Sequence, residues 1–207
     1  MIDINFVSVS EYTVNSEGYR AVELKNIDWS NSYIIQGCSA VYGMGLPDDV
    51  DTVSERLSKK IGKPVINLGV PGSGMQIQYM NAIEMLEKNQ LPLGVFIVYP
   101  NIHRFPLMFD GNIENFGPWC FDNSPRKKYQ QWMYADNSKN HNLWHMRAYR
   151  MLWKLAGVPL YEVTHQGENI FCNNILEEII DWGTDGQHWG PNTAEIIAEM
   201  FYKQIKF

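Results

Sequence analysis

The chain has 207 residues, of which 45% are hydrophobic and 19% charged, an ordinary balance for a globular protein that buries a core. Its formal net charge of −6 argues against nucleic acid as the main partner, because phosphate binding needs clustered Lys and Arg side chains. No apolar run approaches the ~20 residues that span a bilayer, and the first residues lack the basic start and apolar core of a signal peptide. We therefore expect one domain over residues 1–207, without a membrane span and located in the cytoplasm.

Cysteine and histidine spacing gives no sign of a metal site or of a disulfide framework. The three cysteines, Cys38, Cys120 and Cys172, are odd in number and unpatterned. His141 and His145 are four residues apart and could share a helical face as metal ligands do, but no Glu follows His141 to complete a zincin motif. The default interpretation is a surface helix in a protein with no metal and no cofactor.

The N-terminal part of the chain predicts a β extension and then the first strand of the main sheet. Within residues 1–30, strand-like segments at Ile4–Val9 and Tyr19–Leu24 are separated by the turn signal at 15–18. Tyr33–Gln36 is a continuous run of β-branched and aromatic residues ending in Gln. Such a run is typical of a strand buried on both faces of a parallel sheet.

Ser39 follows this strand directly, in the segment Gly37-Cys38-Ser39. A residue just past the carboxyl end of a parallel strand lies at the edge where open α/β sheets bind ligands. A serine there is a weak nucleophile until a base takes its proton. Taken alone, the motif fits a helix N-cap or a loop serine better, so a functional role for Ser39 depends on the rest of the chain.

Strands and helices alternate through the rest of the sequence, which predicts a parallel sheet with helices on both faces. Further strands are expected at Pro64–Gly69, Gly94–Tyr99 and Val158–Thr164. Helices are expected at Asp48–Ile61, at Met75–Lys88, over most of Arg126–Gly157, at Asn174–Trp182 and at the carboxyl terminus. Asp48 or Asp49 is the expected cap of the first helix, and Asn192 or Thr193 is expected to help cap the last. Residues 106–124 are predicted to be a loop excursion.

Polar groups at three strand ends, together with a late histidine, suggest one site. Gly69 ends the second strand and Asn101 follows the third, so both belong to the same sheet edge as Ser39. Asp185 lies three residues before His188; it can hold one imidazole nitrogen and leave the other to accept a proton from Ser39. The Asn101 amide and the N–H groups of Ser39 and Gly69 could surround an oxyanion. Each group also has an ordinary structural explanation, but four coincidences in this order are less plausible than one site.

The motifs resemble those of the SGNH (GDSL-like) hydrolase superfamily. Block I of that family resembles Gly37-Cys38-Ser39, and block II matches Gly69 in Asn-Leu-Gly. Block III matches Asn101, and block V matches Asp185-x-x-His188. The resemblance extends from about residue 33 to the carboxyl terminus and implies a flavodoxin-like three-layer α/β/α sandwich. It also implies roles: Ser39 as nucleophile, His188 as base, Asp185 as the residue that orients it, and Gly69 with Asn101 in the oxyanion hole.

Two departures from the family pattern stand beside the resemblance. The usual Asp before the serine is Cys38, which cannot make the hydrogen bonds of a carboxylate. The usual Gly-x-Asn of block III is Tyr99-Pro100-Asn101, which leaves the aim of the Asn101 amide open. Cys38 is itself a candidate nucleophile, because a thiol is intrinsically better than a hydroxyl, but the family match favours Ser39.

We therefore predict a serine esterase that cleaves a small ester, such as an O-acetyl group on a carbohydrate, with the variable segment 106–157 shaping the pocket. An O-acyltransferase would use the same acyl-enzyme. A non-catalytic carbohydrate- or protein-binding module is the other alternative, and it requires solvent-facing rings at Trp119, Trp132 and Trp144. Arg104 could bind a substrate carboxylate or pair with an acidic residue. The sequence leaves the oligomeric state open.

Overall fold

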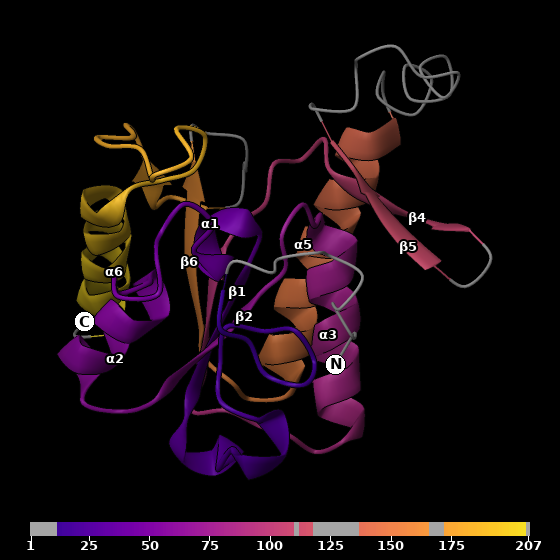
Figure 1. Cartoon of the computed structure of the whole chain (residues 1–207). Helices are drawn as coiled ribbons and strands as arrows, with labels where there is room; N and C mark the ends of the chain where they lie inside the picture. The colour runs from indigo at the N-terminus through magenta and orange to yellow at the C-terminus, as the bar shows by residue number, and fades with distance from the viewer. Residues whose placement is uncertain (1–11, 110–111, 118–136, 166–171, 206–207) are drawn as a thin grey trace.

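A five-stranded parallel sheet with the order β2-β1-β3-β6-β7 forms the centre of the molecule (Figure 1). The computed structural model describes residues 12–109, 112–117, 137–165 and 172–205. The strands are β1 (Tyr33–Gly37), β2 (Val65–Gly69), β3 (Gly94–Val98), β6 (Leu160–His165) and β7 (Ile175–Leu176). Numbered along the sheet this is the flavodoxin-like order 2-1-3-4-5, so the predicted fold class is confirmed.

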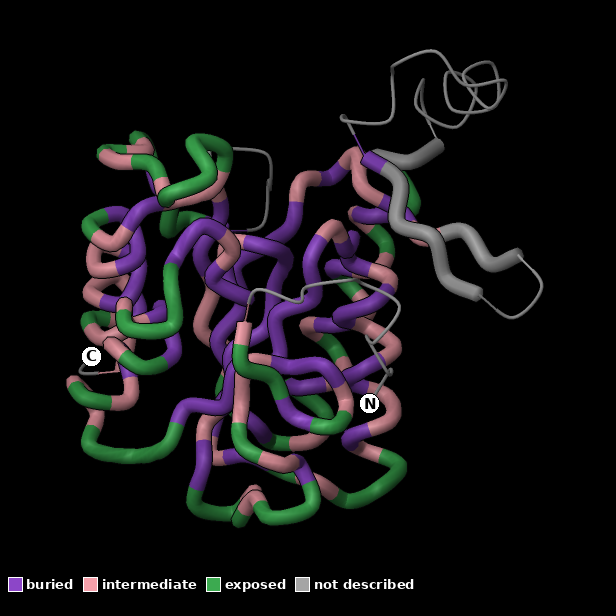
Figure 2. Tube along the Cα trace, in the orientation of Figure 1, coloured by how far each residue is buried: buried purple, intermediate pink, exposed green. Residues whose placement is uncertain are grey.

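Helices cover both faces of the sheet, as the alternation predicts. α3 (Met75–Glu87) and α5 (Asn137–Leu155) lie on one face, and α2 (Val53–Ile61) and α6 (Pro191–Ile205) lie on the other (Figure 1). Successive strand residues point to opposite faces, so Ile34 packs with α3 and α5 while Ile35 packs with α2 and α6. Figure 2 shows the strands buried between these layers. In the described part of the chain, no helix combines the length and apolar character needed to cross a membrane.

The segment before β1 differs from the prediction. Tyr19–Leu24 forms no strand; the chain bends there and continues into two 3₁₀ turns, η1 (Leu24–Asn26) and η2 (Trp29–Asn31). The reason is local, because Asn15 Oδ1 accepts the N–H groups of Glu17 and Tyr19 and so closes a turn. The other predicted strand, Ile4–Val9, lies outside the described residues. The described part of the expected β extension therefore contains no strand.

The cap of α2 is also different. Thr52 caps this helix in a capping box with Glu55, whose carboxylate accepts the Thr52 N–H at 2.7 Å. Asp48, one of the two predicted caps, instead accepts hydrogen bonds from Thr13 and forms an ion pair with Arg20 at 3.2 Å. Asp48 thus ties the N-terminal segment to the loop before α2.

The predicted loop at 106–124 contains an antiparallel hairpin, formed by β4 (Phe105–Phe109) and β5 (Asn112–Phe116). Residues 118–136 lie outside the described part, as does the beginning of the helix predicted from Arg126; the described helix α5 starts at Asn137. The described part of the stretch between β3 and α5 therefore contains a hairpin.

The helix predicted at Asn174–Trp182 is wrong. The Thr164 N–H donates to the Asn174 carbonyl at 3.0 Å, and the Asn174 side chain donates to the Glu162 carbonyl. These bonds to β6 draw the chain into the two-residue strand β7, and Trp182 then forms an isolated bridge with Trp189. Pairing with a neighbouring strand overrides the helical spacing of the apolar residues in this segment.

Candidate active site

A tight turn after β1 presents Ser39 at the carboxyl edge of the sheet, where α1 (Ser39–Tyr42) begins (Figure 1). A Cβ atom at Gly37 would lie only 2.8 Å from the carbonyl oxygen of Val98 on the neighbouring strand, so this turn requires glycine. Ser39 is 5% exposed. The backbone thus holds the hydroxyl in a recessed position at the sheet edge.

Asp185 holds the imidazole of His188. Its Oδ2 lies 2.6 Å from His188 Nδ1, and its Oδ1 accepts the backbone N–H groups of Gln187 and His188 at 2.9 and 3.0 Å. Partial burial raises the pKa of Asp185, but these hydrogen bonds outweigh that effect and leave the pKa below its usual value. An ionised Asp185 holds the proton of a neutral His188 on Nδ1 and leaves Nε2 as the acceptor.

Contacts with the chain after α1 position the loop that carries this pair. The Thr184 N–H donates to the Gly45 carbonyl at 2.9 Å. Gly45 has φ +81°, and a Cβ atom there would lie 2.9 Å from Asp185 Oδ1, so only glycine allows this approach. The carboxyl-terminal loop thereby packs directly beside the Ser39 segment.

The two segments meet in a cavity of about 190 Å³. Its lining residues come from the ends of β1, β3 and β6 and from the carboxyl-terminal loop: Cys38, Ser39, Ala40, Val98, Tyr99, Asn101, Arg104, His165, Gln187, His188 and Trp189. The structure thus brings together the predicted residues Ser39, Asn101, Arg104 and His188, with Asp185 bound to His188. No hydrogen bond joins Ser39 to His188 in the described structure; they share the cavity without direct contact of this kind.

Asn101 is oriented by its own turn. Its Oδ1 accepts the His103 N–H at 2.8 Å, and its carbonyl accepts the Arg104 N–H at 3.0 Å. Asn142 of α5 donates to the Arg104 carbonyl at 2.9 Å and so connects the turn to the helix. Because Oδ1 faces the backbone, Nδ2 is the atom of Asn101 that can donate to an oxyanion.

Gly69 has a clear packing role. Its N–H donates to Asn67 Oδ1 at 3.0 Å, and Gly69 is not among the cavity-lining residues. A Cβ atom at Gly69 would collide with the backbone of Tyr42 in α1. Asn67 also donates to the Val41 carbonyl at 2.9 Å, so Asn67 and Gly69 together fix α1 against β2. The role of Gly69 in an oxyanion hole stays a prediction, and it requires the N–H to change its acceptor.

The two departures from the family pattern both lie at the cavity. Cys38 precedes α1, is 8% exposed and makes no side-chain cap. The Tyr99 hydroxyl donates to Glu162, which also pairs with Arg150 at 3.1 Å. Burial raises the pKa of Glu162. Tyr99 thus anchors the Pro100 turn to β6.

Sequence reasoning missed His165 and Trp189 as cavity residues. His165 ends β6, one residue past the predicted strand Val158–Thr164, and so belongs to the same sheet edge as Ser39. Examining the polar residue at each strand end would have found it. Trp189 directly follows His188.

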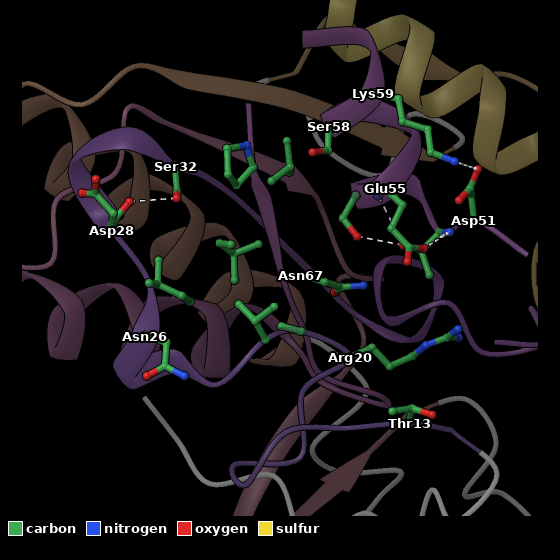
Figure 3. Close-up of a pocket in the computed structure, with 18 of the residues that line it drawn as sticks. Thr13, Arg20, Asn26, Asp28, Ser32, Asp51, Glu55, Ser58, Lys59 and Asn67 are labelled. Atoms are coloured by element: carbon green, nitrogen blue, oxygen red, sulfur yellow. Dashed lines mark hydrogen bonds and ion pairs between the residues drawn. The ribbon is translucent and has the colours of Figure 1, made fainter. Parts of the chain in front are cut away.

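A larger cavity of about 790 Å³ lies beside β2, between the N-terminal segment and α2 (Figure 3). Several of its polar side chains are already partnered: Lys59 pairs with Asp51 at 2.5 Å, and Ser32 donates to the Asp28 carbonyl at 2.8 Å. None of the predicted site residues lines it. The chemistry of the chain is therefore gathered at the smaller cavity.

The histidine pair of α5 has a structural setting. His145 Nδ1 lies 2.7 Å from the His141 carbonyl, and the His145 ring packs against Tyr79. Across the described ranges, no three His, Cys, Asp or Glu residues are grouped as metal ligands would be.

Comparisons with known proteins find similarity at the level of structure. No family model matches the sequence, and no curated protein is significantly similar to it. Among solved structures, the chain is similar to esterase EstA from Pseudoalteromonas sp. (14% identity, 86% of this chain and 97% of that one, TM-score 0.43). It is also similar to a catalytic mutant of Axe2, an acetylxylan esterase from Geobacillus stearothermophilus (11% identity, 87% of this chain and 96% of that one, TM-score 0.44). A third similar structure is an aryl esterase of M. smegmatis (13% identity, 86% of this chain and 99% of that one, TM-score 0.36). All three of these proteins are named as esterases. At these identities and TM-scores, the roles of individual residues rest on the geometry of this chain.

Proposed function

We propose that the protein is a serine ester hydrolase in which Ser39 forms an acyl-enzyme, His188 is the base and Asp185 orients His188. The observation that carries this proposal is the cavity of about 190 Å³ lined by Ser39, Asn101 and His188, behind which Asp185 lies 2.6 Å from His188. A nucleophile, a base and a residue that orients the base are the minimum set for acyl transfer to serine.

The reaction follows from this arrangement. Ser39 Oγ attacks the ester carbonyl while His188 Nε2 takes the hydroxyl proton; the C–O bond to the alcohol then breaks, and His188 returns the proton to the departing alcohol. Water, deprotonated by His188, attacks the acyl-enzyme and releases the acid and free Ser39. In an O-acyltransferase, an acceptor alcohol would replace that water.

The tetrahedral intermediate carries a negative oxygen that needs donors. Asn101 Nδ2 and the Ser39 N–H are the donors we propose, with the Gly69 N–H as a third that must first leave Asn67 Oδ1. Removing one such donor in other serine hydrolases lowers kcat by about 10²–10³. The cavity is smaller than the ~300–1,000 Å³ typical of pockets for drug-sized ligands, which favours a short acyl group such as acetyl.

The test is labelling by a fluorophosphonate probe together with turnover of p-nitrophenyl acetate. We expect wild type to be labelled and to turn over the ester, and Ser39→Ala to lose both while its circular dichroism spectrum is unchanged. Cys38→Ser is the matched control at the adjacent position; it should keep labelling and turnover. Activity that survives Ser39→Ala but disappears in Cys38→Ser would transfer the nucleophile role to Cys38.

A binding module is the second candidate, because Trp144 is 62% exposed on α5 and exposed aromatic rings favour carbohydrate binding. Trp119 and Trp132, the other rings that this candidate requires, lie outside the described residues. A folded wild-type protein that is neither labelled nor active, but that binds an oligosaccharide in calorimetry, would favour this candidate over the esterase.

A further inference from the structure

A second histidine faces the proposed reaction site. His165 is the last residue of β6 and lines the same cavity as Ser39 and His188. Its ring lies against the ring of Trp189, with a centroid separation of 5.9 Å. Because Trp189 directly follows His188, the imidazole of His165 lies on the side of the cavity formed by the carboxyl-terminal loop.

Within the described ranges, the imidazole of His165 makes no hydrogen bond. Its Nε2 is buried without a partner, and no hydrogen bond to Nδ1 is found in the described structure. Burial lowers the pKa of His165, so the ring is neutral at neutral pH and has one donor and one acceptor. A buried polar atom with no partner is costly, and at a ligand cavity this points to a partner that arrives with the ligand.

We propose that His165 hydrogen-bonds a hydroxyl group on the alcohol portion of the ester, and that it selects esters of polyhydroxylated alcohols over esters of plain ones. This inference rests on the proposed esterase function. His188 must return a proton to the departing alcohol, so that alcohol lies beside His188, in the cavity that His165 also lines. A hydroxyl matches the ring because each can both donate and accept one hydrogen bond.

The physical basis of the selectivity is the unpaired nitrogen. An alcohol that lacks the hydroxyl would bury the imidazole without satisfying it, and sites built to bond a substrate hydroxyl reject analogues without it strongly for this reason. The Trp189 ring packs against the imidazole at a centroid separation of 5.9 Å and limits its movement.

The experiment compares two acetate esters of similar ring size, a mono-O-acetylated xyloside with free hydroxyls and cyclohexyl acetate. We expect wild type to have the higher kcat/KM for the xyloside. His165→Phe, which keeps a ring for Trp189, should lower kcat/KM for the xyloside about 10-fold or more while changing that for cyclohexyl acetate less than about 3-fold. His165→Gln, which restores one donor and one acceptor, should recover part of the preference.

His141→Phe on the exposed face of α5 is the matched control and should leave both values unchanged. An equal loss on the two esters in His165→Phe would overturn the inference, because it would mean a structural role, and so would no loss on either. Failure of the proposed function is a different result: wild type itself would show no Ser39-dependent turnover of either ester or of p-nitrophenyl acetate, and the inference would fall with it.

Discussion

The hydrogen bond between Asp185 and His188 decides which imidazole nitrogen serves as the base. In Asp185→Asn, the amide can donate to Nδ1, and the proton of the imidazole then moves to Nε2, where it blocks transfer from Ser39. We expect kcat/KM for p-nitrophenyl acetate to fall by about 10²–10⁴, with the melting temperature nearly unchanged because Asp185 is exposed to solvent. Turnover within a few-fold of wild type would contradict this role.

Most of the residues gathered at the cavity could be predicted from the sequence, because parallel strands end at one edge of a sheet. That rule places Ser39, Asn101 and His165 at the same edge, although the site predicted from the sequence contains only Ser39 and Asn101 of these three. The surroundings of Gly69 could not be predicted in this way. Its N–H donates a hydrogen bond to the side chain of Asn67. Whether a side chain accepts a hydrogen bond from the nearby backbone depends on its rotamer, which the pattern of residue types does not specify.

At the scale of elements, long apolar runs were predicted correctly and short polar segments were not. The four predicted sheet strands are present because burial on both faces demands continuous apolar residues. Tyr19–Leu24 and Asn174–Trp182 carry ambiguous patterns. A local turn at Asn15 decides the backbone of the first, and bonds to β6, such as that from the Thr164 N–H to the Asn174 carbonyl, decide the second. The helix caps were not predicted correctly either, because Thr52 and Asp181 lie at positions that the predicted helix bounds did not indicate.

Asp181 is the true cap of α6, in place of the predicted Asn192 or Thr193. Its carboxylate accepts the N–H groups of Asn192 and Thr193 at 2.9 and 2.8 Å and the Thr193 hydroxyl at 2.7 Å. Asp181→Ala should therefore lower the free energy of unfolding by about 1–2 kcal/mol, measured by urea denaturation. Because Asp181 also anchors the loop that carries His188, kcat/KM should fall as well.

The matched control is Asp185→Ala, four residues along the same loop. It should remove activity with a smaller loss of stability than Asp181→Ala, because Asp185 is exposed to solvent. If Asp181→Ala left the unfolding midpoint unchanged, the capping role would be wrong. The two variants together separate a residue that holds the loop from a residue that orients the base.

Across the whole molecule, carboxylates connect segments that are distant in the sequence. Asp48 joins the N-terminal segment to the loop before α2, and Glu195 joins α6 to Arg56 and Lys60 of α2 at 2.9 and 2.8 Å. Hydrogen bonds from Thr13 lower the pKa of Asp48, and those from Lys60 and Arg56 lower the pKa of Glu195. Hydrogen bonds likewise leave the pKa of the loop residues Asp181 and Asp185 below the usual value, despite burial.

These shifts predict a fold that loses stability in acid. A carboxyl group with a lowered pKa stabilises the folded state above its ordinary pKa of about 4, and this contribution is lost as the pH falls through the lowered value. Glu162 acts in the opposite sense, since burial raises its pKa, but it is one group against six described carboxyl groups whose pKa is lowered. The melting temperature at low salt should therefore be highest near neutral pH and fall from about pH 5 to pH 3.

The Glu195→Gln variant tests whether the contact between α2 and α6 contributes to this loss. It removes the negative charge that pairs with Lys60 and Arg56 without emptying the space, so it should melt below wild type at pH 7. The gap should shrink as the pH falls through the lowered pKa of Glu195, because the wild-type carboxylate then becomes protonated and loses the charge that pairs with Lys60 and Arg56. A gap that stays constant with pH would assign the effect of the substitution to packing. Turnover of p-nitrophenyl acetate at pH 7 should not change, since the contact lies away from the cavity-lining residues. That result would show that the contact between α2 and α6 contributes to stability and not to the reaction.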